Sequence, residues 1–274
     1  MYCPQPTLSP TVLTIAGSDP SGGAGIQADL KTMTAIGVYG AAAITCITVQ
    51  NSLGVTESVP LESGLVLRQV QAVLADHHVT HIKIGMIGTM EIATALGGLL
   101  ADYSGEVIYD PVLASTTGQS LLSCSRLAEL SGQLISKATV LTPNGDELAQ
   151  LAHQKIATAE EALRCARAIL TRHEHLRAVI VKGGHLEPDS TDIHDYLVMK
   201  NEKVVVSKRK RIQSANLHGT GCTYASAFAA FHCRERDYRK VFSLTAVYMD
   251  SIINRSSSIS LVKSRANGPL VHAL

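Results

Sequence analysis

Short apolar segments alternate with longer amphipathic ones along most of this chain of 274 residues. The short segments are rich in β-branched residues, which is typical of buried strands. They are Val12–Ala16, Ala41–Val49, His81–Ile84, Val107–Tyr109, Val140–Leu141 and Ala178–Val181. Between them, apolar residues recur at helical spacing in Ile26–Ile36, Leu65–His77, Met90–Tyr103, Arg126–Lys137 and Glu160–Arg172. This alternation predicts an α/β fold, in which a mostly parallel central sheet is covered by helices on both faces.

The last third of the chain departs from the alternation. Tyr196–Met199 and Lys203–Ser207 are separated by three polar residues and predict an antiparallel hairpin. Two helices follow, which begin near Cys222 and near Tyr238. Because we find no linker, repeat or low-complexity segment, residues 1–274 are expected to form a single domain. Residues 1–10 contain three prolines and are expected to be a loose lead-in.

The composition is that of a globular protein with a well-filled core. Apolar residues make up 46% of the chain and charged residues 17%, and the net charge of +1 gives no general attraction to nucleic acid or membranes. Six scattered cysteines lack the spacing of a zinc site, and no apolar stretch approaches the about 18 residues of a membrane span. No signal peptide is evident. We therefore expect a reduced, cytoplasmic protein without nucleic-acid or membrane partners.

The segment His218-Gly219-Thr220-Gly221-Cys222-Thr223 runs from a glycine-rich loop into a helix. The first amides of a helix have no intrahelical partner, and glycines allow an anion to approach them closely. This pattern predicts a site for a phosphate or for the charge that develops during its transfer. A thiol at a helix start, as in Cys222, is expected to have a lowered pKa. The alternative is a glycine cap followed by a small buried cysteine.

Polar or glycine-rich sequence follows each of six predicted strands. In open parallel sheets, ligands bind at the carboxyl ends of the strands, so these segments predict one binding site. They are Gly17–Gly25, Gln50-Asn51, Gly85-Met86, Asp110-Pro111, Thr142–Asn144 and Lys182–His185.

The first glycine loop resembles two nucleotide-binding patterns without satisfying either. Gly17 to Gly22 has the spacing of a phosphate-binding P-loop, but Gly23 stands where the lysine would be. The spacing of Gly23, Gly25 and Ala28 also fits a dinucleotide fingerprint. That fingerprint needs an acidic residue near the end of the next strand, where this chain has Gln50. Nicotinamide binding is therefore a weak alternative.

Five polar residues carry the chemistry that we expect at this edge. Asp110 ends a strand and Glu147 lies on the first turn of a helix, and two carboxylates with water and phosphate oxygens suffice for Mg²⁺. Favourable charge at the helix start explains Glu147 equally well. Lys182 ends a buried strand and is expected to meet a nucleotide phosphate. Gln50 offers a donor and an acceptor together, which suits a heteroaromatic ring with adjacent ring nitrogen and amino group. Asp29 is either a surface charge or a ligand contact.

We assign no function to two clusters of basic residues. The basic run Lys208–Arg211 is expected to be a solvated edge that discourages strand pairing. His77, His78 and His81 lack a further ligand at metal spacing and are expected to lie on the surface.

Taken together, these segments resemble the hydroxymethylpyrimidine/phosphomethylpyrimidine kinases of thiamine biosynthesis. The match begins with Thr14–Thr32 and is collinear from about residue 12 to Gly268-Pro269. It includes Val49–Asn51, Lys83–Met86, Asp110–Val112, Thr142–Asn144 with Glu147, Val181–His185 and His218–Thr223. The family has a ribokinase-like fold, a three-layer sandwich, and is related to pyridoxal kinases.

The resemblance implies ATP- and Mg²⁺-dependent phosphorylation of 4-amino-5-hydroxymethyl-2-methylpyrimidine and then of its monophosphate, for thiamine diphosphate biosynthesis. Cys222 would be catalytic, as a base or a substrate contact, beside an anion hole formed by Gly219 and Gly221. We assign the remaining residues by ligand: Gly17, Asp29, Gln50 and Met86 to the pyrimidine, Lys182, Thr220 and Asn144 to the nucleotide, and Asp110 and Glu147 to the metal. Related enzymes are commonly dimers, so we expect a homodimer.

The chain departs from the family pattern at two places. Thr116-Thr117-Gly118-Gln119 replaces the usual Lys-Ser-Gly-Asp, and Asn144-Gly145-Asp146-Glu147 replaces Asn-Leu-Pro-Glu. The first change removes two charges near the expected phosphate path, which predicts a weaker second phosphorylation. Alternatives are a pyridoxal or pyridoxine kinase and a pyrimidine-binding regulator that has lost turnover.

Overall fold

The computed structural model describes residues 9–112, 132–263 and 267–272. In this part of the chain nine strands form one sheet in the order β3-β2-β1-β4-β5-β6-β7-β8-β9. Strands β2, β1, β4, β5, β6 and β7 are mutually parallel, and β3, β8 and β9 pair antiparallel at the two ends. The strands are β1 Thr11–Ser18, β2 Tyr39–Asn51, β3 Gly54–Pro60, β4 Val79–Ile84, β5 Glu106–Tyr109, β6 Val140–Leu141, β7 Ala178–Val181, β8 Asp192–Met199 and β9 Val205–Lys210.

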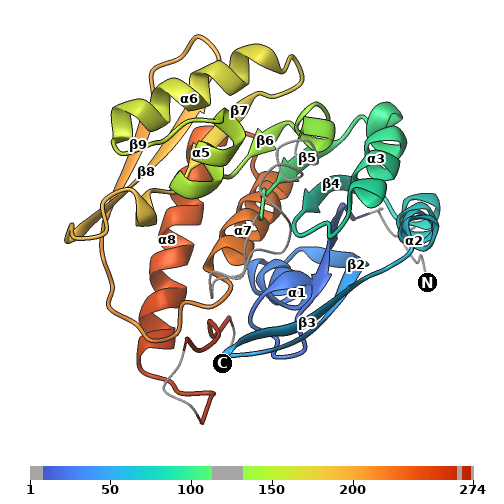
Figure 1. The fold of residues 1–274 in the computed structure, drawn as a ribbon, viewed down its shortest axis with the longest axis horizontal. Coiled ribbons are helices and arrows are strands. Elements are labelled where there is room, and N and C mark those ends of the chain that lie inside the picture. Colours follow the sequence, from blue (N-terminus) through green and yellow to red (C-terminus); the bar gives the residue numbers. More distant parts are fainter. Residues whose placement is uncertain (1–8, 113–131, 264–266, 273–274) are drawn as a thin grey trace, which may run out of the picture.

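Helices cover both faces of the sheet (Figure 1). One face packs against α2, α3, α5 and α6 through a core that includes Ile15, Val70 and Leu96. The other face packs against α1, α7 and α8 through a core that includes Val12 and Phe228. The helices are α1 Gly25–Ile36, α2 Ser63–Asp76, α3 Met90–Leu99, α5 Gly145–Ala152, α6 Ala159–Arg172, α7 Thr220–Arg234 and α8 Tyr238–Ser257, with short 3-10 turns at Leu100–Asp102 and Gly183–His185. The predicted α/β sandwich is confirmed.

The predicted elements agree with the structure except at the sheet edges. Strand β3 was not predicted, because most of its side chains are exposed and its sequence lacks apolar alternation. The last strand is Val205–Lys210 rather than Lys203–Ser207, so it continues into the basic run.

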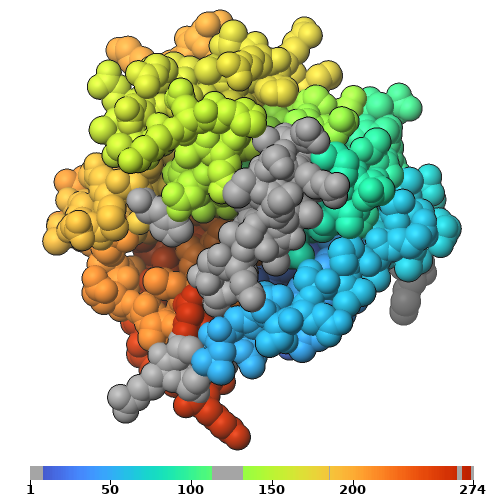
Figure 2. All heavy atoms as spheres, in the orientation of Figure 1, coloured from blue at the N-terminus to red at the C-terminus, as the bar shows by residue number. Residues whose placement is uncertain are grey.

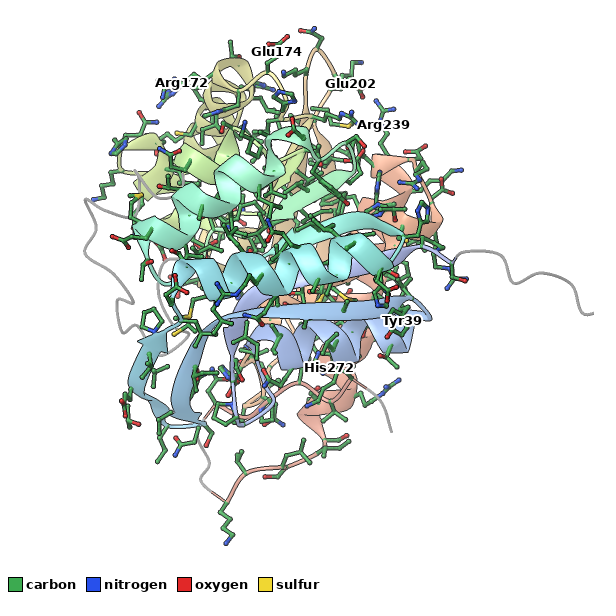
Figure 3. The ribbon with its side chains drawn as sticks, turned by 90° about the vertical axis from the view of Figure 1, so that its right-hand side faces the viewer. Tyr39, Arg172, Glu174, Glu202, Arg239 and His272 are labelled. Atoms are coloured by element: carbon green, nitrogen blue, oxygen red, sulfur yellow. The ribbon has the colours of Figure 1, made fainter. Side chains whose placement is uncertain are left out.

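An ion pair between Arg239 and Glu202 joins the start of α8 to the turn between β8 and β9 (Figure 3).

Two further expectations can be checked on the described residues. The predicted helix Arg126–Lys137 lies partly outside them, and residues 132–135 are helical. Cys46, Cys165, Cys222 and Cys233 are free thiols. Of the helices that the structure describes, none has the length and apolar character needed to cross a membrane.

Candidate active site

A cavity of about 750 Å³ opens at the carboxyl ends of the parallel strands. Because these strands run in one direction, their C-terminal segments meet at one edge of the sheet. Figure 2 shows a hollow on this face, between the yellow-green atoms of α5 and the orange atoms that lead into α7. Eleven predicted site residues line the cavity: Gly17, Gln50, Met86, Asp110, Asn144, Glu147, Lys182, Gly219, Thr220, Gly221 and Cys222.

The two glycine loops touch each other at one side of the cavity. Gly219 caps α7 with a φ of 85°, and a Cβ at this position would lie 1.7 Å from the carbonyl oxygen of Gly23. Only glycine tolerates both that conformation and that approach. A Cβ on Gly221 would lie 3.4 Å from Lys182 Nζ and 3.7 Å from Asp110 Oδ2. The start of α7 therefore faces the charged residues that follow β5 and β7.

Lys182, Asp110 and Glu147 form a buried group of alternating charge. Lys182 Nζ lies 2.8 Å from Asp110 Oδ1 and 3.6 Å from Glu147 Oε2. Burial opposes charge on all three groups. The two carboxylates nevertheless raise the pKa of Lys182. The ammonium groups of Lys182 and Lys83 lower the pKa of Asp110. For Glu147 burial prevails and raises the pKa to about 7. At neutral pH the group therefore holds a firm Lys182–Asp110 pair and a carboxyl that titrates easily.

Glu147 and Asn144 also hold the start of α5. The Asn144 side chain accepts a hydrogen bond from the backbone N–H of Glu147 at 2.8 Å, and Glu147 Oε2 accepts one from the backbone N–H of Asn144 at 2.7 Å. This is a capping box. The structure thus shows Glu147 both at a helix start and in the cavity, which confirms its place at the helix start, whereas its role as a metal ligand stays a prediction.

The two oxygens of the Asp110 carboxylate differ in their contacts. Its Oδ1 atom is bonded to Lys182 and to Thr142, whereas its buried Oδ2 atom has no hydrogen-bond partner in the described part of the protein. A buried carboxylate oxygen of this kind fits Mg²⁺, which takes one or two carboxylates together with phosphate oxygens and water. Among the described residues no cluster of three or more acidic, histidine or cysteine side chains could hold a metal alone.

Asp29 lies outside the cavity lining, unlike the other predicted contacts. Its side chain is fully buried and both oxygens lie 2.9 Å from Lys83 Nζ. Thr14 and Ser226 donate further hydrogen bonds at 2.6 Å each. These four bonds saturate the carboxylate. The structure therefore places Asp29 beneath the cavity, where it neutralises the buried Lys83 ammonium, rather than at its surface.

The expectation for the Cys222 thiol is contradicted. Burial raises its pKa to about 11, the nearby Lys83 ammonium lowers it only in part, and Asp29 and Asp110 raise it further. The position in the first turn of α7 does not outweigh these effects. Cys222 lines the cavity as a neutral thiol at physiological pH.

Thr220, Met86 and Gly17 take defined positions in the lining. The Thr220 hydroxyl donates to the carbonyl of Leu217 at 2.6 Å, which ties the first residue of α7 to the loop before it. Met86 Sδ lies 3.3 Å from the position that a Cβ on Gly17 would occupy. A larger residue at Gly17 would therefore crowd the methionine.

Two of the predictions for basic residues are wrong. Arg209 is mostly buried, pairs with Asp195 at 3.0 Å and lines the cavity together with Arg211, so the run Lys208–Arg211 is only partly solvated. The run does lie on the edge strand β9. His81 is fully buried against His232, rather than on the surface. Strand alternation could have indicated the inward Arg209, but no local signal marks His81.

Sequence reasoning missed Asp19 and His218 as site residues. Asp19 is 2% exposed and lies 2.9 Å from His218 Nε2, which in turn lies 3.0 Å from the Gln50 amide. All three residues line the cavity. The signal was present in part, because each of the two residues sits inside a glycine loop that we singled out.

Comparison with known proteins places this site in a family. A family model described as phosphomethylpyrimidine kinase matches residues 19–269. The chain belongs to this family. The hydroxymethylpyrimidine/phosphomethylpyrimidine kinase of Rhizobium meliloti is 39% identical over 262 residues, which cover 95% of this chain and 96% of the relative. The predicted family is thus confirmed, and with it the class of enzyme.

Solved structures of related kinases have the same fold. A phosphomethylpyrimidine kinase from Clostridium difficile matches with a TM-score of 0.76 and 34% identity, over 89% of this kinase and 98% of that chain. The pyridoxal kinase from Staphylococcus aureus in complex with ADP matches with a TM-score of 0.84 and 29% identity, over 97% and 94%. The ribokinase-like architecture and the relation to pyridoxal kinases are therefore confirmed.

Proposed function

We propose that this kinase transfers the γ-phosphoryl group of ATP to the hydroxymethyl group of 4-amino-5-hydroxymethyl-2-methylpyrimidine and then to the resulting monophosphate. The observation that carries the proposal is the convergence, in one cavity, of the α7 glycine loop, the Lys182–Asp110 pair and the Gln50 amide. Family membership supports the reaction. The ADP in the related pyridoxal kinase supports a nucleotide as phosphoryl donor.

The residues on the nucleotide side of the cavity act on the negative charge of the phosphate groups. Phosphoryl transfer needs mainly positioning and the stabilisation of charge on the transferred oxygens. Lys182 supplies a fixed positive charge, and the backbone of Gly219 and Gly221 supplies amide groups at the start of α7. Thr220 and Asn144 hold the loops on either side of the nucleotide. Mg²⁺, when bound through Asp110 and Glu147, neutralises charge on the phosphate oxygens.

The acceptor side holds the ring and the hydroxyl group. Gln50, Met86 and Gly17 border the pyrimidine, and Asp29 acts from below by fixing Lys83. Cys222 contacts the hydroxymethyl group as a thiol. In the transfer the hydroxyl oxygen forms a bond to the γ-phosphorus as the bond from that phosphorus to the β–γ bridging oxygen breaks and ADP leaves. The hydroxyl proton, which becomes acidic as the new bond forms, then passes to an oxygen of the transferred phosphoryl group. A loose transition state needs no strong base for this order of events.

Pyridoxal phosphorylation is the second candidate function. It is favoured by the TM-score of 0.84 to a pyridoxal kinase, since that enzyme acts on a hydroxymethyl group of a similar ring. A pyrimidine-binding regulator without turnover is the third. The buried Lys182–Asp110 pair argues against it, because ring binding alone does not need those charges.

Steady-state ADP release distinguishes these functions. The chain is supplied with Mg-ATP and, in turn, hydroxymethylpyrimidine, its monophosphate and pyridoxal, with Lys182→Met as the inactive control. Turnover of both pyrimidines is expected. Turnover of pyridoxal alone would replace the proposal by a role in vitamin B6 salvage, and tight pyrimidine binding without turnover would support the regulator.

Three finer predictions remain to be tested. Thr116 and Gln119 lie outside the described residues, and we expect Thr116→Lys with Gln119→Asp to raise the rate of the second phosphorylation relative to the first. An unchanged ratio of the two rates would contradict this. The homodimer is tested by light scattering on the purified chain, and the cytoplasmic location by fractionation.

A further inference from the structure

A chain of hydrogen bonds crosses from the first glycine loop to the end of β2, beside the expected ring site. His218 Nε2 lies 2.9 Å from Asp19 Oδ2 and 3.0 Å from the Gln50 side-chain amide. Asp19 and His218 are 2% and 5% exposed, so water does not compete for these contacts. The three residues come from positions up to 199 apart in the sequence. The proposed reaction does not itself use Asp19 or His218.

The Asp19 carboxylate is an acceptor in every contact that it makes. Its Oδ1 accepts from the backbone and hydroxyl of Ser21, and its Oδ2 accepts from the backbone N–H groups of Gly23 and Ala24. Burial alone would raise the pKa of Asp19, but the bonds from His218, Ser21 and Ala24 lower it to about 2. An ionised carboxylate has no proton to donate. The proton between Asp19 and His218 must therefore be on His218 Nε2.

This proton decides which end of the Gln50 amide faces the imidazole. A ring N–H can share its proton with an amide oxygen, whereas an amide N–H₂ group would place two donors against each other. The contact at the other end of the Gln50 amide leads to the same orientation. The Thr48 hydroxyl lies 3.4 Å from Gln50 but already donates its proton to the carbonyl of Ser18 at 2.8 Å. Thr48 can therefore only accept from Gln50, so its neighbour must be the amide nitrogen.

Amide oxygen and nitrogen have nearly the same shape, so the network decides their assignment. From these contacts we infer that Asp19 and His218 are positioning residues, which hold the Gln50 oxygen toward the imidazole and its N–H₂ group toward Thr48 and the cavity. Gln50 then presents a donor to the ligand. The site consequently selects a ring that offers a hydrogen-bond acceptor, such as an unprotonated ring nitrogen, at this edge. The inference rests on the proposed function, because it concerns ring recognition in the same cavity.

A double-mutant cycle tests whether His218 acts through Gln50. Binding of hydroxymethylpyrimidine is measured by calorimetry for wild type, Gln50→Ala, His218→Phe and the double variant. Each single change is expected to weaken binding about five- to tenfold, as for one neutral hydrogen bond. The double variant is expected to bind no more weakly than Gln50→Ala, with the KM for ATP unchanged. Losses that multiply in the double variant would overturn the inference.

His272→Phe is the matched control. His272, which is labelled in Figure 3, is also buried, at 4% exposed. Its Nε2 lies 2.9 Å from the Thr223 hydroxyl, and neither residue lines the cavity. We expect this change to leave pyrimidine binding unaltered. A loss equal to that of His218→Phe would show that any buried histidine near α7 has this effect, and would overturn the inference.

A second measurement avoids the His218 variant altogether. Two analogues of the pyrimidine, each with one ring nitrogen replaced by C–H, are bound to wild type and to Gln50→Ala. One analogue is expected to bind wild type about five- to tenfold more weakly than the pyrimidine does, and this difference is expected to vanish in Gln50→Ala. No loss with either analogue, or a loss that persists in Gln50→Ala, would overturn the inference.

Turnover of the wild-type chain separates this inference from the proposed function. If wild type phosphorylates the pyrimidine but the losses of binding free energy from the two single variants add in the double variant, only the inference fails. If wild type binds the ring with the predicted coupling but does not phosphorylate it, only the proposed function fails. Failure to bind the pyrimidine at all would overturn both.

Discussion

The two ends of the parallel strands both bury titratable side chains, but they do so differently. At the carboxyl end, Lys182 and Asp110 border a cavity of about 750 Å³, and Asp110 Oδ2 has no hydrogen-bond partner among the described residues. At the amino end, His81 Nε2 lies 3.0 Å from His232 Nδ1, and the His232 ring stacks on Tyr238 with centroids 4.8 Å apart. Burial of ionisable groups therefore does not by itself mark a functional site.

Electrostatics separates the two regions further. Lys182 and Asp110 at the carboxyl end are paired and stay ionised, because each lowers the free-energy cost of burying the charge of the other. The two histidines face one another and Arg236, and burial followed by this repulsion lowers the pKa of His81 to about 3. Burial also lowers the pKa of His232. The two histidines at the amino end thus stay neutral, although the Glu106 carboxylate beside them is ionised, whereas Lys182 and Asp110 at the carboxyl end keep their charges at a cavity.

Loss of the Lys182 charge should have the largest effect on activity. In Lys182→Met, Asp110 and Glu147 lose the ammonium group that lies 2.8 and 3.6 Å away, and the phosphate loses its fixed cation. We expect kcat/KM to fall about 1000-fold, near the upper end for one stabilising group. Lys200→Met is the control, since Lys200 donates hydrogen bonds to the exposed carbonyls of His173 and Glu174 and does not line the cavity. A loss below tenfold would show that the pair is structural, like the histidine cluster.

Gly219→Ala should be the next most harmful change. The new Cβ would lie 1.7 Å from the Gly23 carbonyl in a conformation that favours glycine, so the two loops must separate. We expect kcat/KM to fall about 100-fold, because misplaced amides stabilise phosphoryl oxygens poorly. Gly98→Ala is the matched control, since nothing lies within 4 Å of a Cβ there. Equal activity of the two variants would contradict the role of loop contact.

The histidine cluster should affect stability and not activity. Unfolded histidines bind protons below about pH 6.5, whereas the buried pair does not, so the cluster's contribution to stability is lost as pH falls from 6.5 toward 3. The raised pKa of Glu147 has the opposite effect on stability, because it favours the folded state as pH falls. We therefore compare wild type with His232→Phe by urea unfolding at pH 7.5 and 4.5. The variant should lose less of its free energy of unfolding than wild type does over this range.

The activity of His232→Phe provides the contrast with the cavity. At pH 7.5 its kcat/KM should equal that of wild type, because the cluster lies at the other end of the strands. An equal pH dependence of unfolding in both proteins, or a loss of activity, would remove the distinction between the two regions.

Removal of the Cys222 thiol should have the smallest effect. Because burial raises its pKa to about 11, a thiolate is scarce at neutral pH. We expect Cys222→Ala to lower kcat/KM about tenfold, as for the loss of one contact. Above the titration of Glu147, whose pKa is about 7, the pH profile of wild type between 8 and 9 should be flat. A tenfold rise per pH unit that disappears in Cys222→Ala would instead identify Cys222 as the general base.

Local sequence was sufficient for most of the fold. Strands β1, β2 and β4 to β8 were predicted because their sequences contain short apolar runs, a property carried by neighbouring residues. The capping box of Thr158 and Glu161 was equally visible, since both partners lie within one turn. Strand β3 was missed for the converse reason: its exposed side chains have no apolar pattern.

The position of the site was also determined by the sequence. Parallel strands place their C-terminal segments at one edge, so eleven of the twelve predicted residues line one cavity. The exception, Asp29, shows the limit of this reasoning. Its saturation by Lys83, which is 54 residues away, has no local signal.

What the tertiary structure alone decided is the state of each group. The thiol of Cys222 is neutral because of the burial and carboxylates around it, and His81 is buried because α7 brings His232 against it. The Asp19–His218–Gln50 chain joins two loops and the end of β2, which lie far apart in the sequence. Residue type and spacing fix which chemistry is available, whereas pKa and hydrogen-bond direction depend on neighbours that only folding brings into contact.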